Sequence, residues 1–146
     1  MRFLLVAINA KYIHSNPAVY SLRAYAERFG PALSAVPAAS RGAAQAGQAE
    51  IEIAEYTINQ PFWEILAGLY GKKPDAVGFS CYIWNREPVF ALARELGKLL
   101  PHVPVWLGGP EVSYDPEETL CALPSAAGVM IGEGEETFRE LIELYA

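Results

Sequence analysis

The sequence predicts a single α/β domain built on a doubly wound parallel sheet of five strands, with helices on both faces. Its 146 residues match the commonest domain size, and its 52% hydrophobic and 19% charged residues provide enough apolar surface for one core. Short apolar runs alternate with segments of helical periodicity along the whole chain, which is the pattern of β/α units. For five such strands the order 2-1-3-4-5, as in flavodoxin-like folds, is common.

The first half of the chain contains two expected strands and two expected helices. Residues Phe3–Ile8 form a continuous apolar run, typical of a strand buried on both faces, and a helix follows over Pro17–Phe29. Residues 32–48 are poor in large apolar side chains and predict a mobile loop. Strict alternation over Glu50–Tyr56 predicts an edge strand, and Pro61–Tyr70 predicts the second helix.

The second half supplies the remaining elements. Three short apolar runs predict strands at Ala76–Ser80, Val105–Leu107 and Ala127–Ile131. Three helices are expected after them: one through Val89 to Leu100, a short one starting at Asp115-Pro116, and one from Gly134 to Tyr145. The prediction is therefore five strands and five helices.

Charge and composition exclude several classes of partner. A net charge of −6 without a compensating basic cluster disfavours nucleic acid. The opening apolar run is too short for a secretory signal or a membrane span, so no membrane role is expected. Two cysteines in a β/α pattern predict reduced thiols and a cytoplasmic protein.

Ligands of such folds bind outside the carboxyl ends of the strands. Five polar or glycine-bearing loops are expected there: Asn9–Asn16, Thr57–Gln60, Ser80–Asn85, Gly108–Tyr114 and Gly132–Glu136. The pair Gly108 and Gly109 allows close approach of a ligand to the backbone, or alternatively forms a tight turn. Ser80 is a candidate donor to a ligand, or a turn cap, and Tyr82 and Trp84 either line an apolar pocket or pack under the following helix.

The loop after the first strand is crowded with polar residues, including Asn9, Lys11, Tyr12 and His14. A lone histidine is more often a hydrogen-bonded loop residue than a metal ligand, so no metal site is predicted. The chain lacks G-x-G-x-x-G after its first strand, the P-loop motif and any catalytic triad order, and we expect no catalysis by this chain alone.

Three strand ends carry a family resemblance. With Gly78-Phe-Ser-Cys-Tyr82, Leu107-Gly-Gly-Pro-Glu111 and Met130-Ile-Gly-Glu-Gly-Glu-Glu-Thr-Phe138, the chain resembles the amino-terminal cobalamin-binding domains of radical S-adenosylmethionine enzymes. Its segment Asn9-Ala-Lys-Tyr-Ile-His-Ser-Asn16 is similar to a mostly uncharacterised subgroup often called Fe–S oxidoreductases.

The resemblance implies a cobalamin site. Ser80 would meet the base of the nucleotide tail, and Gly108 and Gly109 would make room for that tail. Asn9 and Lys11 stand where the usual D-x-H-x-x-G motif has its Asp and His, so no lower axial ligand is assigned. The predicted cofactor-binding set is Asn9, Lys11, Tyr12, His14, Ser80, Tyr82, Trp84, Gly108, Gly109, Glu111, Gly132, Glu133 and Gly134.

The family's cluster motif needs three thiolates for a [4Fe–4S] centre, and this chain has two distant cysteines. The resemblance therefore implies that the cluster and S-adenosylmethionine bind a missing barrel domain, and that residues 1–146 are truncated from a longer oxidoreductase or methyltransferase.

Two other functions stay open at this point. A flavodoxin-like domain for a flavin or nucleotide is favoured if the rings of Tyr82 and Trp84 flank a flat slot. A protein-docking domain is favoured if Gly108 and Gly109 are covered by neighbouring side chains. Receiver domains need acidic residues where this chain has Asn9 and Ser80, and are excluded.

Overall fold

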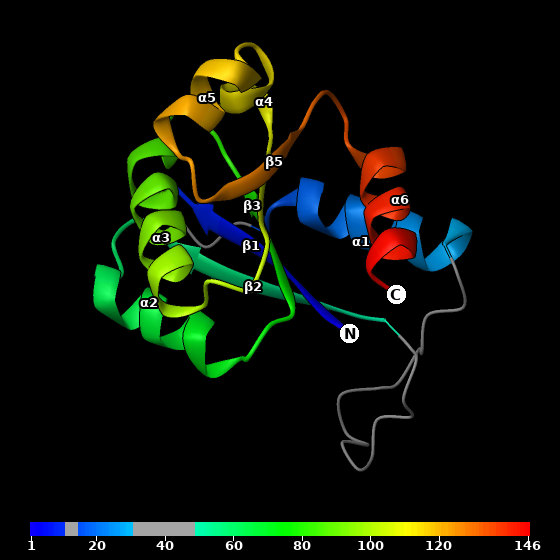
Figure 1. Cartoon of the computed structure of the whole chain (residues 1–146), viewed down its shortest axis with the longest axis horizontal. Helices are drawn as coiled ribbons and strands as arrows, with labels where there is room; N and C mark the ends of the chain where they lie inside the picture. The colour runs from blue at the N-terminus through cyan, green and yellow to red at the C-terminus, as the bar shows by residue number, and fades with distance from the viewer. Residues whose placement is uncertain (11–14, 31–48) are drawn as a thin grey trace.

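The five strands of the computed structural model, which describes residues 1–10, 15–30 and 49–146, are all parallel and follow the order β2-β1-β3-β4-β5 (Figure 1). The strands are β1 (Arg2–Asn9), β2 (Glu50–Thr57), β3 (Ala76–Ser80), β4 (Val105–Gly108) and β5 (Ala126–Met130). The predicted sheet, its order and the edge position of β2 are confirmed. The loop predicted at 32–48 lies outside the described residues.

The helices lie on both faces of this sheet (Figure 1). They are α1 (Pro17–Phe29), α2 (Phe62–Gly71), α3 (Arg86–Leu99), α4 (Pro110–Ser113), α5 (Pro116–Ala122) and α6 (Glu135–Tyr145). Helices α1 and α6 lie side by side on one face, and α2 and α3 cover the other. The chain therefore changes direction between β1 and β3, which are neighbours in the sheet, and a crevice is expected there.

Alternation along the strands produces two apolar cores. On β1, the side chains of Leu4, Val6 and Ile8 join the core under α2 and α3, and those of Phe3, Leu5 and Ala7 join the core under α1 and α6. The ring of Phe3 meets Phe138 of α6 edge-on, with centroids 4.9 Å apart. Burial on both faces explains why β1 reads as a continuous apolar run.

Caps fix where two of the helices begin. The Asn16 side chain accepts a hydrogen bond from the Ala18 N–H at 3.1 Å, and Pro17 occupies the first helical position of α1. Gly134 precedes α6 with a φ of 85°, a left-handed conformation that favours glycine.

The structure corrects the sequence prediction in two places. The described residues contain six helices rather than five, because the segment predicted as a loop from Gly108 to Tyr114 holds the one-turn helix α4. Gly108 belongs to β4, and β5 ends at Met130, which leaves Ile131 exposed beyond the sheet. Periodicity cannot reveal a single turn of helix, since four residues contain barely one period. Among the described residues, no helix combines the length and apolar character needed to span a bilayer.

Candidate functional site

The α1/α6 face of the sheet carries a row of small side chains near its carboxyl edge. The strand register places Ala7 of β1 beside Ser80 of β3, and Ser80 beside Gly108 of β4. On β5 the row ends at Met130, which pairs with Gly108. Three small residues in adjacent strands leave room between the sheet and the helix that covers it.

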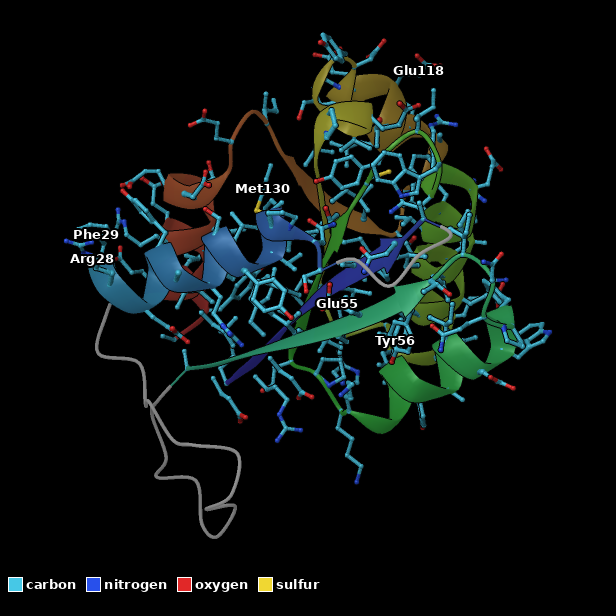
Figure 2. The ribbon with its side chains drawn as sticks, turned by 180° about the vertical axis from the view of Figure 1, so that it is seen from behind. Arg28, Phe29, Glu55, Tyr56, Glu118 and Met130 are labelled. Atoms are coloured by element: carbon cyan, nitrogen blue, oxygen red, sulfur yellow. The ribbon has the colours of Figure 1, made fainter. Side chains whose placement is uncertain are left out.

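A cavity of about 520 Å³ occupies this room. Its inner walls come from the sheet, α1 and β5: Leu5, Ala18, Val19, Leu22, Gly78, Phe79, Ser80, Gly108 and Met130. Its mouth is formed by residues beyond the strand ends: Tyr82, Gly109, Pro110, Ser113, Tyr114, Ile131, Gly132, Glu133 and Gly134. Figure 2 shows Met130 beside the first turn of α1. The volume is that of a small-molecule site.

The register also gives the depth of this sheet-edge cavity. Leu5 pairs with Gly78, two residues below the Ala7–Ser80 pair. Two residues of a parallel strand span roughly 6.6 Å. The cavity therefore reaches about one pleat below Ser80, to a floor made by apolar side chains and a glycine, which suits a flat apolar group.

The two glycines at the end of β4 do different things. A Cβ built on Gly108 would meet only Met130 atoms, the nearest at 3.5 Å, which is ordinary contact. Gly109 has a φ of 106°, and a Cβ there would lie 2.5 Å from the Cys81 carbonyl oxygen. Gly109 is therefore required by the close approach of two backbones, whereas Gly108 keeps the cavity open.

Asn16 links the start of α1 to Ser80. Its Nδ2 donates to the Ser80 Oγ at 3.3 Å, and its Oδ1 caps α1. Asn16 is 7% exposed and Ser80 9% exposed, so water competes little for this bond. Of the two roles left open for Ser80, a turn cap is not what the structure shows: its hydroxyl accepts from Asn16 on the cavity wall.

Glu55 of the edge strand β2 anchors the same segment. Its carboxylate accepts hydrogen bonds from the Asn16 backbone N–H at 2.8 Å, the Tyr20 hydroxyl at 2.8 Å and the Asn9 side-chain amide at 3.2 Å. Burial acts to raise the pKa of Glu55, but the three donors outweigh it, and the pKa lies below its ordinary value. Figure 2 shows Glu55 on β2, near the start of α1.

Asn85 closes the crevice between β1 and β3. It is fully buried, and its Nδ2 donates to the carbonyls of Ile8 and Ser80 at 2.9 and 3.0 Å. Its Oδ1 accepts from the Tyr82 N–H at 2.7 Å. The Asn85 amide thus binds the carbonyl groups at the ends of β1 and β3 and fixes the turn that carries Tyr82.

The rings of Tyr82 and Trp84 are stacked on each other, with centroids 4.5 Å apart and planes 4° apart. Parallel rings at this separation are already in contact, so no isoalloxazine fits between them. Trp84 is 46% exposed and does not line the cavity. The flat slot between Tyr82 and Trp84 that would favour a flavin site is therefore absent.

The predicted site residues fall into three groups. Seven line the cavity: Ser80, Tyr82, Gly108, Gly109, Gly132, Glu133 and Gly134. Three lie outside its lining: Asn9, whose amide binds Glu55; Trp84; and Glu111, whose carboxylate lies 3.7 Å from the Arg86 guanidinium. Lys11, Tyr12 and His14 lie outside the described residues.

Sequence reasoning missed Glu55, Asn85 and the cavity role of Met130. Each acts through residues that are distant in sequence. Their local patterns, an alternating strand for Glu55, a helix start for Asn85 and an apolar run for Met130, contain no signal for these roles. The sequence pattern did show Asn16 beside a helix start, which is a cap signal, but not its contact with Ser80.

In a comparison with protein families, the model described as the B12 binding domain aligns with residues 4–142. Among curated proteins, the chain is 35% identical over 79 residues to 2-(S-pantetheinyl)-carbapenam-3-carboxylate methyltransferase from Streptantibioticus cattleyicolor. It is 34% identical over 82 residues to the cobalamin-dependent radical SAM methyltransferase TokK from Streptomyces tokunonensis. These matches cover 54% and 56% of the chain but only 11% and 12% of the relatives, so the chain aligns with a small part of each.

Solved structures show the same fold. The cobalamin-dependent S-adenosylmethionine radical enzyme OxsB, with aqua-cobalamin and S-adenosylmethionine bound, matches 99% of this chain and 18% of its own, with a TM-score of 0.71 and 18% identity. The response regulator domain of Thermotoga maritima CheB matches 98% of this chain and 89% of its own, with a TM-score of 0.52 and 14% identity. At such identities the likeness concerns the fold alone.

Proposed function

Because this chain belongs to the B12 binding domain family, we propose that it binds cobalamin in the sheet-edge cavity, as one part of a radical S-adenosylmethionine methyltransferase. The observation that carries this proposal is the cavity itself, which opens at the carboxyl edge of the sheet, where such folds bind ligands. The curated relatives support the class of the whole protein, since they are methyltransferases several times longer than this chain.

The residues present fit the nucleotide tail of cobalamin. That tail ends in a flat, largely apolar benzimidazole, and the inner cavity is apolar with the single hydroxyl of Ser80 on its wall among the described residues. Gly108 leaves the space that a side chain would take, and Ser80 would donate to the base. The corrin ring would lie outside, over the mouth formed by Tyr82 and the segment from Gly132 to Gly134.

Bound cobalamin supplies a redox-active cobalt centre, and this chain supplies the binding site and the orientation. Its own residues do three things: the Ser80 wall holds the tail, α1 and Met130 exclude water from the tail, and Asn85 fixes the turn carrying Tyr82 at the mouth. No catalytic step is assigned to this chain.

We place the remaining chemistry in a longer protein of which residues 1–146 are a piece. The [4Fe–4S] cluster and S-adenosylmethionine would bind the missing barrel domain, which is this domain's partner. A cytoplasmic location fits two free cysteines, one buried at Cys81 and one exposed at Cys121.

The test is a titration of the purified chain with hydroxocobalamin, followed by visible absorbance and by the colour that the protein retains after gel filtration. We expect saturation at one equivalent and a coloured protein peak. A folded chain that retains no colour, repeated with the full-length protein, would overturn the proposal. A parallel titration with flavin mononucleotide is expected to show no binding, since the stacked Tyr82 and Trp84 rings leave no slot.

A further inference from the structure

Helix α2 is apolar on its outer side as well as on the side that faces the sheet. Three of its side chains are buried in the core, and Trp63, Ala67 and Tyr70, at positions i, i+4 and i+7, are exposed on the other side. Glu64 is the only charged residue among its ten. A helix that is apolar all round is normally covered on all sides, so these three exposed residues, the outer α2 face, form a candidate contact surface.

The other long helices have the ordinary polar outer side. Helix α3, which lies beside α2, exposes Glu87, Arg94 and Lys98, and α6 on the opposite face of the sheet exposes Glu136 and Glu140 (Figure 1). Both pair a buried apolar stripe with charged residues in water, as a surface helix does. The apolar outer side is therefore a property of α2 and not of the whole surface.

The rings of the outer α2 face are suited to binding a protein. Trp63 is 69% exposed and Tyr70 is 50% exposed. The Trp63 ring is held edge-on against Phe62, with centroids 5.0 Å apart, and Phe62 packs against the core. A ring that is already held in place loses little freedom on binding, and tryptophan and tyrosine are enriched among the residues that dominate interface energies.

Opposite charges lie at the two ends of this face. Glu64 is exposed in the first turn of α2, and Lys73 is exposed just after the last turn, where its N–H donates to the Tyr70 carbonyl at 3.1 Å. Among the residues that the structure describes, neither charge forms an ion pair. A second α2 laid antiparallel on the first would bring Glu64 of each copy towards Lys73 of the other, and Trp63 towards Tyr70. The face thus complements itself, which is what a two-fold interface between identical chains requires.

We propose that the outer α2 face joins two copies of this chain, with α2 packed antiparallel on α2. At their exposures, Trp63 and Tyr70 leave roughly 250–300 Å² of ring surface in water, so two copies would bury about 500–600 Å² from these rings. That is about half of the ~1,200 Å² at which stable interfaces begin, and flanking residues supply the rest. We therefore expect a weak dimer, with a dissociation constant in the micromolar range. The interface lies on the face of the sheet opposite to the cavity, so it is independent of cobalamin binding.

The experiment is sedimentation equilibrium of the purified chain from about 1 to 500 μM, a range that brackets a micromolar dissociation constant. We expect a monomer–dimer equilibrium that Trp63→Ala weakens at least about tenfold. Leu144→Ala is the matched control, because Leu144 is a 75% exposed apolar residue on α6, and it should leave the equilibrium unchanged. A chain that is monomeric throughout overturns the proposal, and so does a dimer that Trp63→Ala leaves intact. A monomeric full-length protein in which Trp63 is shielded from acrylamide quenching would show that another of its domains covers this face, and would also overturn it.

Charge reversal tests the antiparallel arrangement without touching the rings. Glu64→Lys and Lys73→Glu each place like charges at both ends of the interface, and each should weaken self-association about threefold to tenfold at low salt. An equimolar mixture of the two variants restores opposite charges at both ends, and we expect it to associate as the wild type does. Recovery in the mixture cannot come from misfolded variants. A mixture that associates no better than either variant alone would overturn the antiparallel dimer.

Discussion

Filling the sheet-edge cavity from Gly108 tests whether the cavity holds the cofactor. In Gly108→Leu the new Cβ makes ordinary contact with Met130 and no contact with backbone closer than 3.8 Å, so the fold should form without strain. The leucine side chain would then occupy the cavity and gain about 1.5–3 kcal/mol from burial. A nucleotide tail could enter only by expelling it, and cobalamin affinity is expected to fall roughly tenfold to a hundredfold.

The assay is the hydroxocobalamin titration, with thermal unfolding as a check on the fold. Gly71→Leu is the matched control, because a Cβ at this glycine at the end of α2 meets nothing within 4 Å. We expect wild-type affinity in the control and an unfolding temperature in Gly108→Leu that is at least as high as that of the wild type. Full cobalamin affinity in a folded Gly108→Leu protein would refute the assignment of the cavity.

The neighbouring glycine is unsuitable for this test. Any side chain at position 109 would meet the Cys81 carbonyl oxygen, and its residue would have to adopt the φ of 106° that Gly109 has. Such a substitution is expected to cost about 1–3 kcal/mol in the free energy of unfolding, so a loss of binding would not show whether the cavity was blocked.

Three further predictions concern the groups around the site. Asn85→Ala leaves two carbonyls and one N–H without a partner and should lower the free energy of unfolding by about 2–4 kcal/mol in urea denaturation; a loss below 1 kcal/mol would contradict the role of this amide. Burial raises the pKa of Cys81 to about 12, so at pH 8 one thiol, that of Cys121, should react with a disulfide reagent in the native protein and two in the unfolded one; two fast native thiols would contradict this. The pKa of Glu55 is lowered on folding, so its stabilisation is complete above the ordinary glutamate pKa and is lost as the pH falls through the folded value. The stability difference between wild type and Glu55→Gln should therefore be largest near neutral pH and shrink in acid, and a difference that grows on acidification would be the wrong sign.

The residues at the carboxyl edge of the sheet show which site positions a local sequence pattern can predict. Ser80 and Gly108 were found from the sequence because each directly follows a buried apolar run, a position that predicts an exposed strand end. Trp84 and Glu111 lie a few residues beyond a strand end and do not line the cavity, since the stacking on Tyr82 and the ion pair with Arg86 hold them elsewhere. Proximity to a strand end is therefore insufficient to place a side chain in the site.

The sequence by itself determined the five strands, five of the six helices of the described residues, the parallel sheet and the edge of the sheet at which the cavity opens. It could do so because apolar periodicity and helix caps are local properties of a few consecutive residues. Only the tertiary structure decided that the Ser80 hydroxyl accepts a hydrogen bond from Asn16, because the two residues are 64 positions apart in sequence. The same holds for the cavity, whose walls exist only once Ala7, Ser80 and Gly108 are brought into one row. Strand register and helix docking bring these residues together, and local sequence patterns do not encode such long-range contacts.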